Sequence, residues 1–174
     1  MNFIKIIKPL KKYIPQNIWN FYREIYVKNE NKLFFLQKSV KFQVGKFTID
    51  APKNYPLIKL IKTQPYRDLF IGISAKYISK KYPDGTIIDI GANIGETACM
   101  IASYCSNSLI LVEPSNFYYT YLVKNSKTIP NKIVIVKSII SDGNDIIGEL
   151  LHWGGTAFIS NISSKKDIYK TKKL

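Results

Sequence analysis

The sequence contains little cysteine, histidine and arginine, and it has no long apolar run. Its 174 residues include two cysteines, Cys99 and Cys105, and one histidine, His152. Two cysteines are too few for a disulfide scaffold or a zinc cluster, and one histidine cannot build a histidine metal site by itself. No segment reaches the roughly 18 consecutive apolar residues that span a bilayer. We therefore expect no bound metal, a reduced cytoplasmic environment and no membrane-spanning helix.

Positive charge is abundant: the formal net charge is +14, and nearly all of it is lysine, because Arg23 and Arg67 are the only arginines. Arginine is the side chain that binds bases and phosphates in two-pronged contacts, and the lysines here are spread along the chain. We interpret them as a solvated surface and expect no specific nucleic-acid binding. Attraction to an anionic membrane or glycan surface stays open.

The composition and length indicate one globular domain with a short appendage. Hydrophobic residues make up 46% and charged residues 22% of the chain, which is typical of folded domains. We place a basic, amphipathic N-terminal extension at residues 1–38, a domain at 39–162 and a polar, frayed tail at 163–174. Residues 16–28 fit an amphipathic helix with an aromatic face. We expect it to dock on its own domain or a partner; contact of residues 1–28 with the inner face of a membrane is the alternative.

The chain contains two kinds of pattern. Residues 40–49 alternate apolar and polar around Gly45, which predicts a β-hairpin, and residues 146–159 predict a second antiparallel pair. Residues 57–62 and 68–81 predict helices, the second with its apolar residues on one face. From residue 86, short continuous apolar runs alternate with helical segments: strands at 86–90, 109–112 and 133–136, and helices at 96–104 and 115–126. This alternation predicts an α/β fold with a parallel sheet whose strands are buried.

The segment Asp89-Ile-Gly91-Ala-Asn93-Ile-Gly95-Glu96-Thr97 follows the first of these strands and opens a helix. Ligands bind at the carboxyl ends of strands in such sheets, and glycines let the backbone approach them closely. Glu113 closes the second strand, where an acid can bind ribose hydroxyls. The alternative is a glycine turn that serves strand–helix packing alone. Because the strand, the helix and Glu113 occur together, we favour a ligand site.

The spacing does not fit a dinucleotide fingerprint. Counted from Gly91, the second glycine of GxGxxG falls on Asn93 and the third on Glu96, and a glutamate at the helix start would repel a pyrophosphate. S-Adenosylmethionine has no phosphate and carries a sulfonium cation. An acidic strand end followed by GxNxG suits that ligand better.

These segments, together with Leu111-Val-Glu113-Pro114-Ser115, resemble the FkbM-type S-adenosylmethionine-dependent methyltransferases. The similarity runs from about residue 40 to about residue 159 and includes Pro65-Tyr66-Arg67-Asp68 and Leu122 with Asn125. It implies a Rossmann-like class I methyltransferase core preceded by a basic helical extension. It also implies O-methylation of a hydroxyl group on a sugar, a glycan or a related metabolite. The methyl acceptor would be that small molecule or glycan.

The resemblance also implies roles for individual residues. One group would hold the methionine part of the cofactor: Asp89, Gly91, Ala92, Asn93, Gly95 and Thr97. Glu113 would bind the ribose hydroxyls, Pro114 would fix the following turn, and Ser141 with Asp142 would border the adenine. Asn125 is interpreted as a structural residue at a helix end, and no catalytic base is assigned.

The sequence departs from the family after the third strand. The family's Asp-Val-Glu-Gly type segment on a fourth strand does not occur here, so we expect an incomplete parallel sheet whose first strand lies at an exposed edge. A partner or a second copy could cover that edge. The alternative function is a truncated, non-catalytic remnant or a partner-binding module that keeps the cofactor-binding half of the fold.

Three other features are interpreted as structural. The two cysteines are expected to pack in the core of a reduced protein. At least one of Tyr118, Tyr119 and Tyr121 is expected in the core, because they share a predicted helix. His152 is interpreted as a surface or hydrogen-bonded strand residue, with contact to a substrate as the alternative.

Overall fold

The fold is taken from a computed structural model. The model describes residues 15, 16, 18, 38–53, 55–64, 66, 68–142, 144, 146–153, 156–160, 167–169, 171 and 172. Apart from Gln16 and Ile18, the predicted helix over 16–28 lies outside these residues, as does nearly all of the predicted extension at 1–38.

The N-terminal part of the described chain is a hairpin followed by two helices. Strands β1 (Ser39–Val44) and β2 (Phe47–Pro52) pair antiparallel, as the alternation predicts. Helix α3 (Pro56–Thr63) has proline at its first turn, where a missing N–H costs no hydrogen bond. Helix α4 (Leu69–Lys81) follows and packs on the first helix of the parallel unit.

The centre of the molecule is a three-stranded parallel sheet in the order β3-β4-β5. Its strands are β3 (Thr86–Ile90), β4 (Ser108–Val112) and β5 (Ile133–Val136). Helix α5 (Glu96–Ala102) joins the first two strands, and helix α6 (Asn116–Ser126) joins the second and third. The chain is therefore a mixed α/β fold whose parallel unit is compatible with a Rossmann-like core, as the alternating runs predict.

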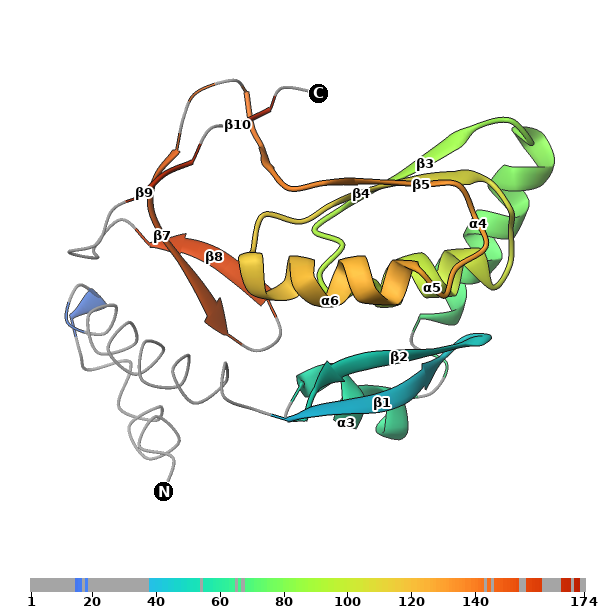
Figure 1. The fold of residues 1–174 in the computed structure, drawn as a ribbon, viewed down its shortest axis with the longest axis horizontal. Helices are drawn as coiled ribbons and strands as arrows, with labels where there is room; N and C mark the ends of the chain where they lie inside the picture. The colour runs from blue at the N-terminus through green and yellow to red at the C-terminus, as the bar shows by residue number, and fades with distance from the viewer. Residues whose placement is uncertain are drawn as a thin grey trace.

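One face of this sheet is covered. Figure 1 shows α5 and α6 lying along it, with the β1–β2 hairpin and α3 forming further layers beyond the helices. Leu109 and Leu111 of β4 point to this side and are 1% and 0% exposed. They pack with Leu122 of α6 in the hydrophobic core, and Tyr118 is also buried there. The core therefore lies between the sheet and the hairpin.

The other face is open within the described part of the chain. The register aligns Ile88 with Ile110 and Ile110 with Val134 across the three strands. Ile88 is 49% and Val134 51% exposed, and Ile90 is 55% exposed. The prediction that these strands are buried is thus wrong for this face: the two helices of the unit lie on the same side, and no described element covers the opposite side (Figure 1).

The C-terminal part contains short strands. Strands β7 (Ile146–Trp153) and β8 (Thr156–Ser160) form the predicted antiparallel pair. The other strands are β6 (Ile139–Ile140), β9 (Asp167–Tyr169) and β10 (Thr171–Lys172). Strand β9 pairs with β7, and β10 pairs parallel with β6. The expectation of a frayed tail is therefore wrong for these residues, because their backbone groups complete the ladders of earlier strands.

Helix α4 corrects a second expectation. The helix forms where its periodicity predicts, but three residues of the predicted apolar face do not face the core: Phe70 is 76%, Ile73 52% and Tyr77 72% exposed. The buried residues are the small Gly72 and Ala75. The ring of Tyr104 lies so close to Gly72 that a Cβ there would collide with it. Small residues allow this close approach, and it turns the apolar stripe outward.

Within the residues that the structure describes, no helix has the length and apolar character needed to cross a bilayer.

Candidate functional site

The candidate site is the loop between β3 and α5, at the carboxyl end of the parallel strands. Three of its residues have left-handed backbones: Gly91 with φ 83°, Asn93 with φ 52° and Gly95 with φ 94°. Glycine adopts this conformation without strain, and asparagine tolerates it better than most residues. The GxNxG spacing therefore places the residues that tolerate positive φ where the turn requires it.

The backbone of the loop is fastened to the neighbouring strand. The N–H groups of Gly91 and Ala92 both donate to the carbonyl oxygen of Val112, each over 2.9 Å. The N–H of Gly95 closes the turn by donating to the oxygen of Ala92 at 2.8 Å. A Cβ built on Gly91 would meet no atom within 4 Å, so the loop borders open space there. Such a space beside a glycine can admit a ligand close to the backbone.

Glu113 binds the loop from the end of β4. Its Oε2 accepts from the N–H of Asn93 at 2.8 Å, and its Oε1 accepts from the N–H of Ser115 at 2.8 Å. Each carboxylate oxygen has a second lone pair, so both can still accept from a ligand hydroxyl. Burial raises the pKa of Glu113, and its two backbone hydrogen bonds lower it. The acid is held with both oxygens fixed beside the loop.

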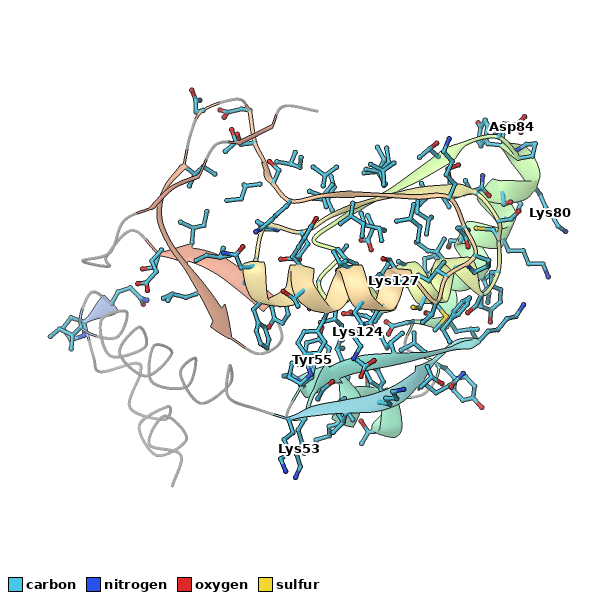
Figure 2. All side chains as sticks on the ribbon, in the orientation of Figure 1. Lys53, Tyr55, Lys80, Asp84, Lys124 and Lys127 are labelled. Atoms are coloured by element: carbon cyan, nitrogen blue, oxygen red, sulfur yellow. The ribbon has the colours of Figure 1, made fainter. Side chains whose placement is uncertain are left out.

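Tyr55 reaches the same loop from the segment between β2 and α3. Its hydroxyl lies 2.9 Å from Asn93 Oδ1 and 3.0 Å from Glu96 Oε1. Figure 2 shows Tyr55 between the hairpin and the helical layer. A hydroxyl has one proton and cannot donate to both oxygens at once. A protonated Glu96 satisfies all three groups, because it donates to Tyr55 while Tyr55 donates to Asn93.

The electrostatics of the site are those of buried acids. Burial, with a smaller contribution from the nearby Asp89, raises the pKa of Glu96 to about 7. The pKa of Asp89 is also raised by burial, and that of Tyr55 is raised by burial and by Glu96. Buried atoms Asp89 Oδ2 and Glu96 Oε2 have no hydrogen-bond partner among the residues that the structure describes. Unpaired buried carboxylate oxygens are costly, and a cationic or hydrogen-donating ligand would relieve that cost.

Asn125 fastens the covered side of the loop. Its Nδ2 donates to the carbonyl oxygens of Asp50 at 2.9 Å and Ile94 at 2.8 Å. Its Oδ1 accepts from the N–H of Asp50 at 2.9 Å. The side chain thus ties the hairpin, the loop and α6 together, which supports the structural interpretation of this residue.

The remaining predicted site residues divide into two groups. Thr97 lies in the first turn of α5, and Pro114 stands between Glu113 and Ser115, so both adjoin the loop region. Ser141 and Asp142 lie beyond β6 and belong to a separate turn. Ser141 Oγ lies 2.8 Å from Thr171 Oγ1, and Asp142 Oδ1 accepts from the N–H of Asn144 at 3.2 Å. These contacts hold the C-terminal strands to the turn after β6.

Two residues of the site were not among the predicted cofactor ligands. Glu96 appears in the motif only as a reason against a pyrophosphate, although its burial makes it central to the charge of the site. No local sequence pattern indicates a role for Tyr55 in the site, because its hydrogen-bond partners lie 38 and 41 residues further along the chain. Only the packing of the hairpin on α5 and α6 brings it to the loop.

Other candidate residues are structural where they can be described. Cys99 is buried and free, burial raises its pKa to about 12, and Cys105 is also free. Ser115 caps α6, its Oγ accepting from the N–H of Tyr118 at 3.2 Å. The side chain of His152 lies outside the described side chains.

Two surface hollows of about 440 and 500 Å³ lie away from the loop, at the end of the sheet where β4 and β5 begin. Lys46, Ser103 and Tyr104 line both. Neither hollow is lined by a carboxylate side chain. We therefore take the loop at the carboxyl end of the strands, and not either hollow, as the candidate ligand site.

Among the described residues, no group of three or more histidine, cysteine, aspartate or glutamate side chains is arranged to hold a metal ion. Asp89, Glu96 and Glu113 therefore surround the loop without converging on one point. Comparison with known proteins gives no match to a protein-family model, a curated protein or a solved structure.

Proposed function

We propose that the loop over residues 91–95 binds S-adenosylmethionine, and that the chain takes part in transfer of its methyl group to a hydroxyl of a sugar or glycan, as in the FkbM-type methyltransferases. The observation that carries the proposal is a pair of buried carboxylate oxygens beside a glycine loop, on Asp89 and Glu96, for which the described part of the chain supplies no hydrogen-bond partner. Such a site favours a cation. S-Adenosylmethionine supplies a positively charged sulfonium that bears an electrophilic methyl group.

The individual residues support distinct parts of this ligand. Glu113, with both oxygens oriented by backbone N–H groups, has lone pairs free for two neighbouring ribose hydroxyls. Asp89 supplies negative charge at the methionine end, and Glu96, with a pKa of about 7, adds to it when it is ionised. Gly91 leaves space against the backbone. The chain's contribution to methyl transfer would be to position the cofactor and the acceptor in line.

The open sheet face favours a second candidate, the partner-binding module. Ile88, Ile90 and Val134 form an apolar surface that no described element covers. A module of this kind would bind the cofactor through the same loop and depend on another polypeptide for turnover. The two candidates differ in activity and agree in cofactor binding.

Calorimetric titration of the full chain with S-adenosylmethionine tests the proposal, with S-adenosylhomocysteine and NAD as comparison ligands. We expect micromolar binding of S-adenosylmethionine, weaker binding of the uncharged S-adenosylhomocysteine, and no binding of NAD. Asp89→Asn and Glu113→Gln should each weaken binding by about 10- to 100-fold, because each removes a charged hydrogen-bond acceptor. Asp84→Asn is the matched control, since Asp84 is exposed and precedes the same strand.

Binding of NAD as tight as that of S-adenosylmethionine, or no binding by a folded chain, would contradict the proposal. Binding without methyl transfer to any sugar acceptor would favour the second candidate.

A further inference from the structure

Helix α4 exposes an apolar stripe to solvent. Phe70, Ile73 and Tyr77 are spaced three and four residues apart, so they lie on one face of the helix. Their exposed fractions, 76%, 52% and 72%, are among the largest of any apolar side chains described. Single exposed apolar residues are common on proteins, but an aligned aromatic stripe on one helix is a feature of binding surfaces.

The opposite face of α4 fixes the orientation of this stripe. Gly72 and Ala75 are buried, and Gly72 packs directly on the ring of Tyr104 after α5. A side chain at position 72 would collide with this ring, so glycine allows the close packing that leaves Phe70 and Tyr77 on the outward face of α4. The stripe therefore lies on the outer surface of the molecule.

The charges within α4 have one sign. The only charged residues within α4 are Lys76, Lys80 and Lys81, and all three are exposed. Figure 2 shows Lys80 extending outward from α4. These lysines belong to a chain with a net charge of +14. An apolar aromatic stripe flanked by lysines complements a surface that is anionic outside and apolar beneath.

We propose that this face of α4, defined by Phe70, Ile73, Tyr77, Lys76 and Lys80, binds the surface of an anionic phospholipid bilayer. The aromatic and isoleucine side chains enter the boundary between headgroups and acyl chains, and the lysines contact the phosphates. Long lysine side chains can do this while their methylene stems lie along the apolar layer. The proposal does not depend on the proposed cofactor site.

A bilayer fits this surface better than a protein groove does. A groove that receives an amphipathic helix encloses much of its circumference, but α4 is already packed along one side on α5. Only its outward face is available, and that face is convex. A convex stripe of about 10 Å, the length of seven helical residues, can be inserted into a planar interface without enclosure.

The test is co-sedimentation of the full chain with lipid vesicles. One set contains phosphatidylcholine alone, and the other contains phosphatidylcholine and phosphatidylglycerol in equal parts. We expect binding to the anionic set and little to the neutral set. The triple variant Phe70→Ala, Ile73→Ala, Tyr77→Ala should partition at least about tenfold more weakly, because binding scales with the apolar area inserted. Lys76→Gln with Lys80→Gln should lose roughly fivefold per lysine, and this loss should shrink at high salt.

Two matched variants serve as controls. Ile88→Ala, Ile90→Ala, Val134→Ala removes similarly exposed apolar side chains from the open sheet face, and Lys127→Gln with Lys132→Gln removes two exposed lysines distant in sequence from α4. Neither should change partitioning by more than about twofold, since only charges near the bilayer contribute strongly. Circular dichroism checks that every variant is folded.

Four results would overturn the proposal. The first three are no binding of the unchanged chain to anionic vesicles, equal binding to neutral and anionic vesicles, and full binding by the α4 triple variant. The last would assign the affinity to another segment, because every variant keeps residues 1–38. An equal fall in the sheet-face control would also overturn it, because the effect would then not be specific to α4.

Discussion

The two faces of the parallel sheet have almost the same side chains and opposite surroundings. On one face, Ile87 aligns with Leu109, and Leu109 is 1% exposed. On the other, Ile88 aligns with Ile110, and Ile88 is 49% exposed. The difference comes from α5 and α6, which both lie on the first side (Figure 1). Apolar runs therefore specify the strands, while the connecting helices decide which face becomes core.

The largest expected effect is a cavity on the covered face. Leu111 is fully buried, so Leu111→Ala should lower the free energy of unfolding by about 3 kcal/mol through lost apolar burial and an unfilled cavity. Val134→Ala on the open face should cost about 0.5 kcal/mol, because half of Val134 is already in water. Urea denaturation of both variants measures the contrast. Equal costs would mean that the open face is covered in solution.

The covered side also contains Glu96, a buried carboxyl group whose pKa is raised. Its pKa is about 7 in the folded protein, against 4.5 for an unperturbed glutamate. Between these values the folded state binds more protons than the unfolded state, so stability falls as the pH rises through this window. Above pH 7 the penalty is complete, on the order of 3 kcal/mol.

Glu96→Gln should remove this penalty. We expect the variant to be more stable than the unchanged chain at pH 8 and to match it near pH 4, where glutamate is protonated in both states. Denaturant unfolding at the two pH values measures the difference. Asp89 and Glu113 also have raised pKa values, and both residues are present in the variant. The difference in stability between the unchanged chain and the variant therefore reports on Glu96. If the two proteins differ in free energy of unfolding by the same amount at both pH values, the raised pKa of Glu96 is contradicted.

Substitutions of the two loop glycines, Gly91 and Gly95, should affect stability and ligand affinity to different degrees. Gly95 has φ 94° and packs against the covered side, where a Cβ would lie 3.1 Å from Leu122 Cδ1. Gly95→Ala should cost about 2 kcal/mol, from the left-handed backbone and this contact together. Gly91→Ala has only the backbone cost, about 1 kcal/mol, because open space surrounds its Cβ.

Their effects on the cofactor should follow the opposite order. The methyl group of Gly91→Ala would occupy the space proposed for S-adenosylmethionine, and that of Gly95→Ala would not. We expect Gly91→Ala to weaken binding more, measured by calorimetry on variants that are folded at the chosen temperature. A larger loss of affinity in Gly95→Ala would place the ligand elsewhere.

Local features of the fold could be read from the sequence. The period-two run around Gly45 and the apolar runs of the parallel strands depend on neighbouring residues, and the strands appear where expected. The GxNxG spacing likewise located the turn with left-handed residues. Such features are encoded within a few residues of one another, so periodicity and turn chemistry are enough to find them.

Contacts between distant segments could not be read in this way. Asn125 binds Asp50 across 75 residues, and Tyr55 reaches Glu96 across 41. The outward stripe of α4 was missed for a related reason: periodicity identifies an apolar face, whereas the packing of Gly72 on Tyr104 decides which face is buried. Strands β9 and β10 were missed because their lysine-rich sequence gives no apolar run, and their pairing depends on the edges of β7 and β6.

The smallest effect is expected for a lysine placed on the open face. The same substitution at the neighbouring position compares the two faces of the sheet directly. Ile88→Lys should lower the free energy of unfolding by about 0.5 kcal/mol or less, because the lysine ammonium reaches water from a half-exposed position. Ile87→Lys, one residue away and packed against the core, should prevent folding or cost several kcal/mol, since the charge would be buried without a partner. Circular dichroism with urea titration compares the two variants. A cost of several kcal/mol for Ile88→Lys that grows with protein concentration would show that a second copy covers this face. The same cost without concentration dependence would show that the chain covers the face itself.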